Sequence, residues 1–276
     1  MPLTTYSRNA ALNHVFGGAG VAYTPAATLY LALCTADPTA AATGASMNEV
    51  TNGDGYARTA ITFGAAASRA VTQSATVTFP ALTANKGTAT HYAVVDSATY
   101  GAGNVLGYGA FAVAKALNPG SGSVQPFVSS GEVVITFTGE ASDYLANTIL
   151  DFMFRNQAFA QPATYIGAAT ATITGATTGS TVSENGAGGY ARVAVNDIGG
   201  ASPAWSAVSG GALSNANDVS LPTATADWTD ITGSFVATAS SGGQILFYDN
   251  LGAPESVLNG DIYRWTSGNY DVNLNA

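Results

Sequence analysis

The chain has 276 residues, of which 47% are hydrophobic and only 9% are charged, and its formal net charge is −9. Its hydrophobic content predicts a folded core, because disordered chains combine low hydrophobicity with high net charge. Eight Lys and Arg residues are too few for a phosphate-neutralising patch, which argues against nucleic-acid binding. No segment approaches the roughly 18 apolar residues of a membrane span, and the first residues lack a secretory signal. We therefore expect a protein that is made in the cytoplasm and binds no membrane.

The chain contains an internal repeat. Gly55-Tyr56-Ala57-Arg58 returns as Gly189-Tyr190-Ala191-Arg192, and several flanking blocks recur in the same order with small changes in spacing. Loops tolerate such insertions, so the pattern indicates a duplicated domain. The sequence predicts two domains, at residues 1–140 and 141–276, called here the first and second copy.

Each copy is expected to open with a short amphipathic helix. Thr4 or Thr5 can cap the first helix, and Ser142 or Asp143 can cap the second. Gly17 and Gly18 are expected to end the first helix. The remainder alternates strand and turn signals, and in the first copy the predicted strands are Thr28–Thr35, Tyr56–Phe63, Ala75–Phe79, Thr90–Val95, Asn104–Phe111 and Glu132–Phe137.

No segment with helical periodicity separates these strands, so a parallel α/β sheet is not expected. Gly and Pro at these spacings are typical of a sandwich or jelly roll. The predicted fold class is mainly β. It consists of two tandem antiparallel β-sandwich or jelly-roll-like domains, each with a short N-terminal helix.

The repeated Gly-Tyr-Ala-Arg motif admits two interpretations. In the structural one, Gly55 and Gly189 form turns, Tyr56 and Tyr190 enter the core, and the two arginines pair with neighbouring segments. In the functional one, Arg58 and Arg192 bind a ligand. We favour the structural interpretation, because turn glycines and packed tyrosines serve the backbone and the core without any ligand.

The sequence offers no convincing catalytic, cofactor or metal site, so we predict that the chain is not an enzyme. His14 and His91 are the only histidines, and neither recurs in the second copy. The lone cysteine, Cys34, is expected to be buried. A Ca²⁺ site in the last stretch would have to come from scattered acids, namely Asp249, Glu255, Asp261 and Asp271.

The two copies differ in charge. Residues 1–140 hold 5 Lys and Arg and 6 Asp and Glu, whereas residues 141–276 hold 3 and 11. Charge keeps exposed surfaces soluble. We therefore hypothesise that the near-neutral first copy packs against a partner and that the acidic second copy faces solvent.

Several first-copy motifs resemble a family of tailed-bacteriophage virion proteins that are called tail-fibre or head-decoration proteins. They are Leu29-Tyr-Leu-Ala-Leu-Cys-Thr-Ala-Asp-Pro38, Gly55-Tyr-Ala-Arg58, Thr78-Phe-Pro-Ala81, Thr88-Ala-Thr-His-Tyr92 and Gly107-Tyr-Gly-Ala-Phe111. The second copy departs from the pattern, since its equivalent of the first motif, Ile166–Ile173, has no Asp-Pro.

This resemblance implies a virion structural protein that assembles in the host cytoplasm. The preferred interpretation is a capsid decoration or cement protein that binds the major capsid protein, with a homo-oligomer expected. The alternative is a tail fibre, adaptor or receptor-binding protein. For that alternative, the candidate contacts to a host surface receptor are Trp205, Trp228 and Trp265. A polysaccharide depolymerase is disfavoured, since its best acid pair, Asp227 and Asp230, lies in a loop.

Overall fold

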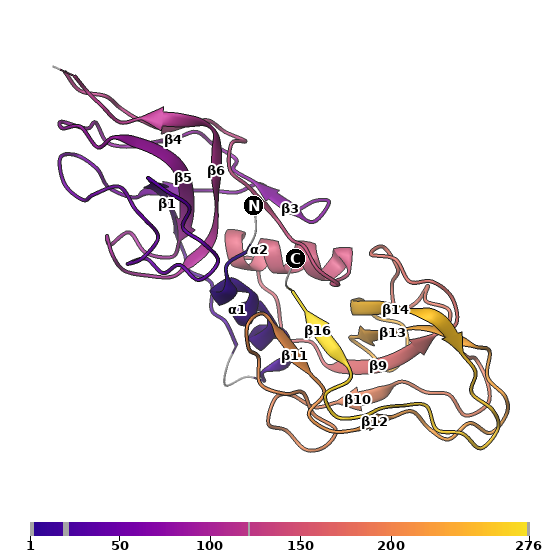
Figure 1. Ribbon diagram of the computed structural model, residues 1–276. Helices are drawn as coiled ribbons and strands as arrows, with labels where there is room; N and C mark the ends of the chain where they lie inside the picture. Colours follow the sequence, from indigo (N-terminus) through magenta and orange to yellow (C-terminus); the bar gives the residue numbers. More distant parts are fainter. Residues whose placement is uncertain (1–2, 19–21, 121, 275–276) are drawn as a thin grey trace. The chain divides into compact units, whose positions relative to one another are not determined.

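A computed structural model describes residues 3–18, 22–120 and 122–274, which form two compact units (Figure 1). The first unit takes its described residues from Met1–Arg8, Thr24–Phe137 and Asn147–Phe159. The second unit takes its described residues from Asn9–Tyr23, Thr138–Ala146 and Ala160–Ala276. The units therefore follow the two copies of the repeat except at the helices.

The first unit is built on a four-stranded antiparallel sheet of order β2-β1-β5-β6. Two further antiparallel pairs, β3-β8 and β4-β7, complete it. The bounds are β1 Leu29–Cys34, β2 Thr59–Ile61, β3 Ala70–Thr72, β4 Val77–Thr78, β5 Thr88–Val95, β6 Val105–Ala116, β7 Phe127–Val128 and β8 Val134–Thr136. All six strands that the sequence predicted are present. The short β3 and β7 escaped prediction, because two or three residues give no readable alternation.

The second unit repeats this topology strand for strand. Its four-stranded sheet has the order β10-β9-β13-β14, and its two pairs are β11-β16 and β12-β15. The bounds are β9 Thr164–Ala169, β10 Val193–Val195, β11 Ala212–Ser214, β12 Val219–Ser220, β13 Ile231–Ala237, β14 Ile245–Glu255, β15 Arg264–Trp265 and β16 Asp271–Asn273. The predicted mainly β fold of two tandem antiparallel domains is confirmed.

Each copy opens with a helix, as the sequence predicted: α1 spans Thr5–Phe16 and α2 spans Asp143–Arg155. Thr4 caps α1, since its Oγ1 accepts a hydrogen bond from the Ser7 backbone N (3.2 Å). Ser142 caps α2 in the same way, through the Leu145 backbone N (3.1 Å). Both caps are buried, and each also donates to a carbonyl at the start of a long sheet strand, Val105 in β6 or Ile245 in β14.

The two helices are shared reciprocally between the units. Helix α1 belongs to the first unit up to Arg8 and to the second unit from Asn9. Helix α2 belongs to the second unit up to Ala146 and to the first unit from Asn147. Each helix is thus capped in the unit of its own copy, and its later turns complete the other unit.

The same contact fixes the exchanged turns in both units. In the first unit, Asn147 Oδ1 accepts a hydrogen bond from the backbone N of Arg69 (2.9 Å). In the second unit, Asn9 Oδ1 accepts one from the backbone N of Gly211 (2.7 Å). Arg69 and Gly211 immediately precede the equivalent strands β3 and β11, and both have positive φ, 63° and 86°. The exchange is therefore a repeated feature of the duplicated fold.

Aromatic packing holds each exchanged helix end. In the first unit, the Phe154 ring lies edge-on to Phe63 with centroids 5.5 Å apart. In the second unit, Phe16 is fully buried, and its ring centroid lies 4.7 Å from that of Trp205 and 5.7 Å from that of Phe247. Removing such a buried ring costs on the order of 3–5 kcal/mol. The predicted boundaries at residues 1–140 and 141–276 stay a prediction, because each unit takes a helical segment from the other copy.

Candidate functional site

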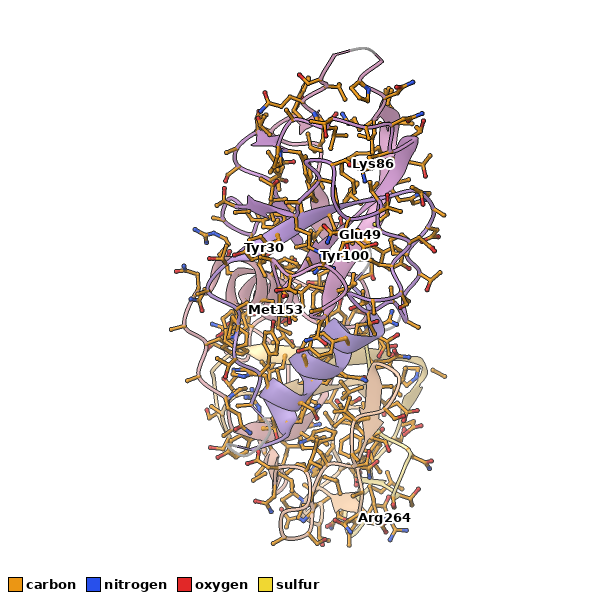
Figure 2. All side chains as sticks on the ribbon, turned by 90° about the vertical axis from the view of Figure 1, so that its left-hand side faces the viewer. Tyr30, Glu49, Lys86, Tyr100, Met153 and Arg264 are labelled. Carbon is orange, nitrogen blue, oxygen red and sulfur yellow. The ribbon has the colours of Figure 1, made fainter. Side chains whose placement is uncertain are left out.

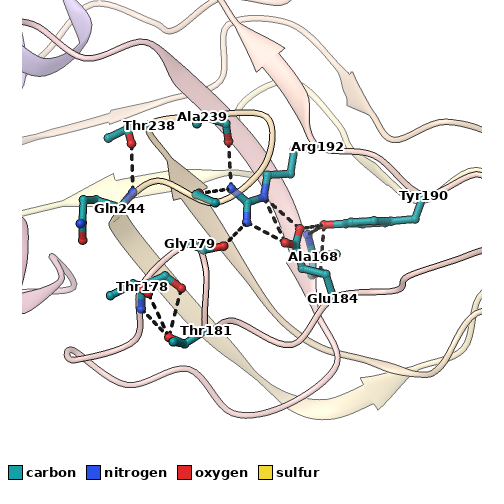
Figure 3. A network of polar contacts seen from close by, with 11 residues as sticks. Ala168, Thr178, Gly179, Thr181, Glu184, Tyr190, Arg192, Thr238, Ala239 and Gln244 are labelled. Atoms are coloured by element: carbon teal, nitrogen blue, oxygen red, sulfur yellow. Dashed lines mark hydrogen bonds and ion pairs between the residues drawn. The ribbon is translucent and has the colours of Figure 1, made fainter.

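The repeated Gly-Tyr-Ala-Arg motif forms one polar cluster in each unit, which we call the arginine clip. The clip of the second unit consists of Arg192, Glu184 and Tyr190 (Figure 3). Arg192 Nη2 lies 2.6 Å from Glu184 Oε2, and Arg192 Nε donates to Glu184 Oε1 at 3.0 Å. The remaining N–H groups of Arg192 donate to three backbone carbonyls, those of Gly179, Ala239 and Gly242.

The clip of the first unit has the same pattern of hydrogen bonds. Arg58 donates to Glu49 from Nε (2.9 Å) and from Nη2 (2.8 Å). Its other N–H groups donate to the carbonyls of Gly44, Ser97 and Ala102. The Arg58 and Glu49 side chains are only 1% and 4% exposed, and Figure 2 labels Glu49 among the side chains of the first unit.

Each clip includes the tyrosine of the motif. Tyr190 Oη donates to Glu184 Oε1 at 2.6 Å and accepts from the Ala168 backbone N in β9. Tyr56 Oη donates to Glu49 Oε1 at 2.9 Å and accepts from the Leu33 backbone N in β1. Burial raises the pKa of both phenols above the usual tyrosine value, and the adjacent glutamates raise it further.

Glycines let the loops close around the guanidinium. A Cβ on Gly44 would lie 1.9 Å from the Ala102 carbonyl oxygen, and a Cβ on Gly179 would lie 2.0 Å from that of Gly242. Within the motif itself, Gly55 has a φ of 86°, and a Cβ there would lie 2.0 Å from the Ala81 carbonyl oxygen. The motif therefore begins with glycine because the backbone approaches a neighbouring loop too closely for a side chain.

The contacts of the clip support the structural interpretation of Gly55, Tyr56, Arg58 and their second-copy equivalents Gly189, Tyr190 and Arg192. A guanidinium has five N–H groups, and in both arginines all five are used internally. Sequence reasoning missed Glu49 and Glu184. A signal was present, because a glutamate precedes the arginine by nine residues in one copy and by eight in the other.

The three candidate receptor-contact tryptophans occupy different environments in the second unit. Trp205 is 1% exposed and donates its indole N–H to Thr164 Oγ1 at 2.9 Å. Trp228 is 6% exposed and donates to the Gly188 carbonyl at 2.8 Å. Trp265 is half-buried and packs edge-on against Tyr263 and Tyr270. Receptor binding by these residues stays a prediction, and Trp265 has the most exposed ring of the three.

Trp265 lines a cavity of about 280 Å³ that we call the acidic aromatic pocket. Strands β14, β15 and β16 and the loop between the last two surround it, with Ser234 of β13 among its lining residues. Three carboxylates and two further aromatic rings line the same cavity, namely Asp249, Glu255, Asp271, Tyr263 and Tyr270. Arg264 also lines it, but its side chain is 53% exposed, and its Nη1 lies 3.4 Å from Asp218 (Figure 2).

The electrostatics around the acidic aromatic pocket are negative. Burial raises the pKa of Glu140, and repulsion from Asp249 and Asp271 raises it further. Burial also raises the pKa of the Tyr263 hydroxyl, and its hydrogen bond to Glu255 adds to the shift. A positively charged group placed in this cavity would be stabilised by the same carboxylates.

Comparison with known protein families identifies the relationships of the chain. Residues 2–136 and again residues 140–273 match the family described as Podophage GP4 fiber I protein gp80. The chain belongs to this family. Each copy of the duplicated domain matches the family separately, so the tandem arrangement inferred from the sequence is confirmed. A comparison with curated proteins finds no match.

Membership of this family makes the chain a phage virion protein, which agrees with the resemblance of its motifs to tailed-bacteriophage virion proteins. No helix among the described residues is long and apolar enough to cross a membrane.

The remaining predicted residues have local structural roles. His14 is buried and belongs to the second unit, whereas His91 lies in β5 of the first unit with Nδ1 2.9 Å from Thr90 Oγ1. Cys34 is buried, as predicted, and burial raises the pKa of its thiol. Asp227 and Asp230 accept hydrogen bonds from Asn259 and Ser256. Within the described ranges, no three His, Cys, Asp or Glu side chains are grouped as metal ligands.

Proposed function

We propose that the chain is a non-enzymatic structural component of a podophage tail fibre. The observation that supports this proposal is the match of both copies to a family described as a podophage fiber protein. The arginine clips support a structural role, because they tie the loops of each unit to its sheet and use every guanidinium N–H group internally.

The capsid decoration interpretation that the sequence favoured has weaker support. The family description names a fiber, and no contact within the described parts of either unit favours binding to a capsid. We accordingly prefer the alternative that the sequence left open, a tail-associated protein. Its partners are other virion proteins, and we propose that it assembles with further copies of itself. Two linked units gain effective concentration when they bind neighbouring sites in such an assembly.

The copy number in purified virions tests this proposal. Quantitative mass spectrometry against the major capsid protein and the portal protein would give the ratio. A fibre component is expected in a small multiple set by tail symmetry, and antibody labelling should decorate the tail. A ratio near that of the capsid protein, with label on the head, would overturn the proposal and restore the decoration protein.

The charge difference between the copies gives a second test, which concerns orientation. If the acidic second copy faces solvent, chemical labelling of carboxylates in intact virions should modify Asp227 and Asp230 more than exposed acids of the first copy such as Asp54. Equal protection of the two copies would contradict this orientation.

A further inference from the structure

The strands that build the acidic aromatic pocket have equivalents in the first unit, but different side chains stand at the matching positions. Strand register identifies the matching positions. Tyr92 in β5 pairs with Gly109 in β6, and Ser234 in β13 pairs with Asp249 in β14. Ser234 therefore stands where the first copy has Tyr92, and Asp249 stands where it has Gly109.

In the first unit, side chains fill this position. Tyr92 is 4% exposed, and its ring centroid lies 4.8 Å from that of Phe111. Lys115 covers the site, with Nζ 5.4 Å from the Phe111 ring centroid and 2.9 Å from Glu132 Oε1. In the first unit the site is thus filled by the Tyr92 and Phe111 rings, and the charge of Lys115 is balanced by Glu132.

In the second unit, the tyrosine and the lysine have both been replaced. Serine replaces the tyrosine plug at position 234, and the same register places Glu255 where the first copy has the Lys115 cover. In the two strand pairs β3-β8 and β11-β16, the register likewise places Asp271 at the position of Val134. The tyrosine and the lysine are lost and three carboxylates are gained, against one partly exposed arginine, Arg264, in the lining, so the cavity is net negative and walled by aromatic rings.

We infer that the acidic aromatic pocket of the second unit binds a single sugar ring that carries a protonated amine, as in a terminal hexosamine of a surface glycan. This inference gives the proposed fibre component an adhesive site, and it rests on the proposed function only for the place of that site in the virion. Carboxylates accept hydrogen bonds from ammonium and hydroxyl groups, and aromatic walls pack against the apolar face of a sugar. A cation near a tryptophan face is attracted further by the ring.

Cavity size and charge restrict the ligand. About 280 Å³ lies just below the usual range for drug-sized ligands, so the pocket holds one ring, with the remaining glycan outside. The second copy, with 11 acidic against 3 basic residues, repels phosphorylated or carboxylated sugars. A neutral sugar can stack and can donate hydroxyl hydrogen bonds to the carboxylates, but it lacks the opposite charge that an ammonium group brings to them.

The indole N–H signals of the three tryptophans provide the readout in the full chain. Trp205 and Trp228 are buried and hydrogen-bonded internally, so their NMR signals serve as controls for Trp265. Titration with methyl glucosaminide, whose glycosidic methyl group mimics glycan attachment, is expected to shift the Trp265 signal. The N-acetylated analogue, which lacks the charge, should bind roughly tenfold more weakly.

Two variants locate the site. Ser234→Tyr restores the plug that the first unit already accommodates, and it should abolish the Trp265 shift. Asp227→Asn, an exposed acid outside the pocket, serves as the matched control and should bind like the parent chain. Unchanged Trp205 and Trp228 signals in Ser234→Tyr would show that the unit still folds.

Three outcomes would overturn the inference: no shift with methyl glucosaminide, equal binding of the N-acetylated sugar, or undiminished binding by Ser234→Tyr. Binding of a lysine-containing peptide in place of the sugar would also overturn it and would indicate a protein partner. The test is separate from that of the proposed function. A chain located on the head that still binds the sugar refutes the fibre role alone, and a tail-located chain that does not bind refutes the pocket alone.

Discussion

Replacing Glu184 with glutamine tests the arginine clip most directly. The substitution keeps the shape of the side chain but removes the carboxylate that faces Arg192 Nη2 at 2.6 Å. Arg192 is 1% exposed and Glu184 is 20% exposed, so the change leaves a buried guanidinium without its counter-charge. Breaking a buried ion pair by removing one partner costs about 3–5 kcal/mol. We expect the low end, about 3 kcal/mol, because water reaches part of Glu184.

Urea unfolding followed by tryptophan fluorescence measures this loss. All three tryptophans lie in the second unit, so the signal reports on the unit that is changed. Arg264→Gln is the matched control, since it removes an exposed ion pair with Asp218 in the same unit and should cost less than about 1 kcal/mol. If Glu184→Gln lowers the free energy of unfolding by no more than this control, the clip does not hold the loops as described.

The helix cap, the buried tyrosines and the exchanged helices can each be tested as well. Ser142→Ala removes the buried cap of α2 and should lower the free energy of unfolding by about 1–2 kcal/mol, whereas Ser142→Asn, which can cap, should recover part of it in the same urea assay. The pKa values of Tyr56 and Tyr190 are raised in the folded state. Their contribution to stability is therefore fully present below about pH 10 and is lost as the pH rises above that value. Tyr190→Phe should reduce this alkaline loss of stability in thermal melts, and an unchanged pH profile would contradict the assignment. A protease site can be inserted beside Thr138, which is exposed. After cleavage, the two fragments should still elute together in gel filtration, because each unit retains helical turns from the other copy. Two separate peaks would refute the exchange.

The sequence was sufficient to predict the fold class, because short segments in which apolar and polar residues alternate, such as Val77-Thr-Phe79, indicate strands with one buried face. Thr4 and Ser142 were among the expected helix caps, since a small hydroxyl side chain directly before an apolar periodic run is typical of a helix N-terminus. The exchange of the helices was beyond prediction. The pattern of apolar residues in α1 predicts a buried face, but it does not identify the sheet that covers Phe16.

The pocket was partly within reach of the sequence. The sequence singled out Trp265 as a candidate receptor contact. It also drew attention to the scattered acids Asp249, Glu255 and Asp271. Their convergence depends on the register of β14 and β16, which a single sequence does not reveal. The decisive replacement of Tyr92 by Ser234 became visible only when the two units could be compared strand by strand.

The reciprocal helices also limit how this protein can evolve by recombination. A duplicated domain offers an apparent point of exchange near residue 140, where the second match to the family begins. A recombinant that replaced only one half would have to supply a foreign helix that fits the retained sheet, including the asparagine contact before β3 or β11. The two halves are therefore expected to be inherited together, because each unit depends on a helical segment from the other copy.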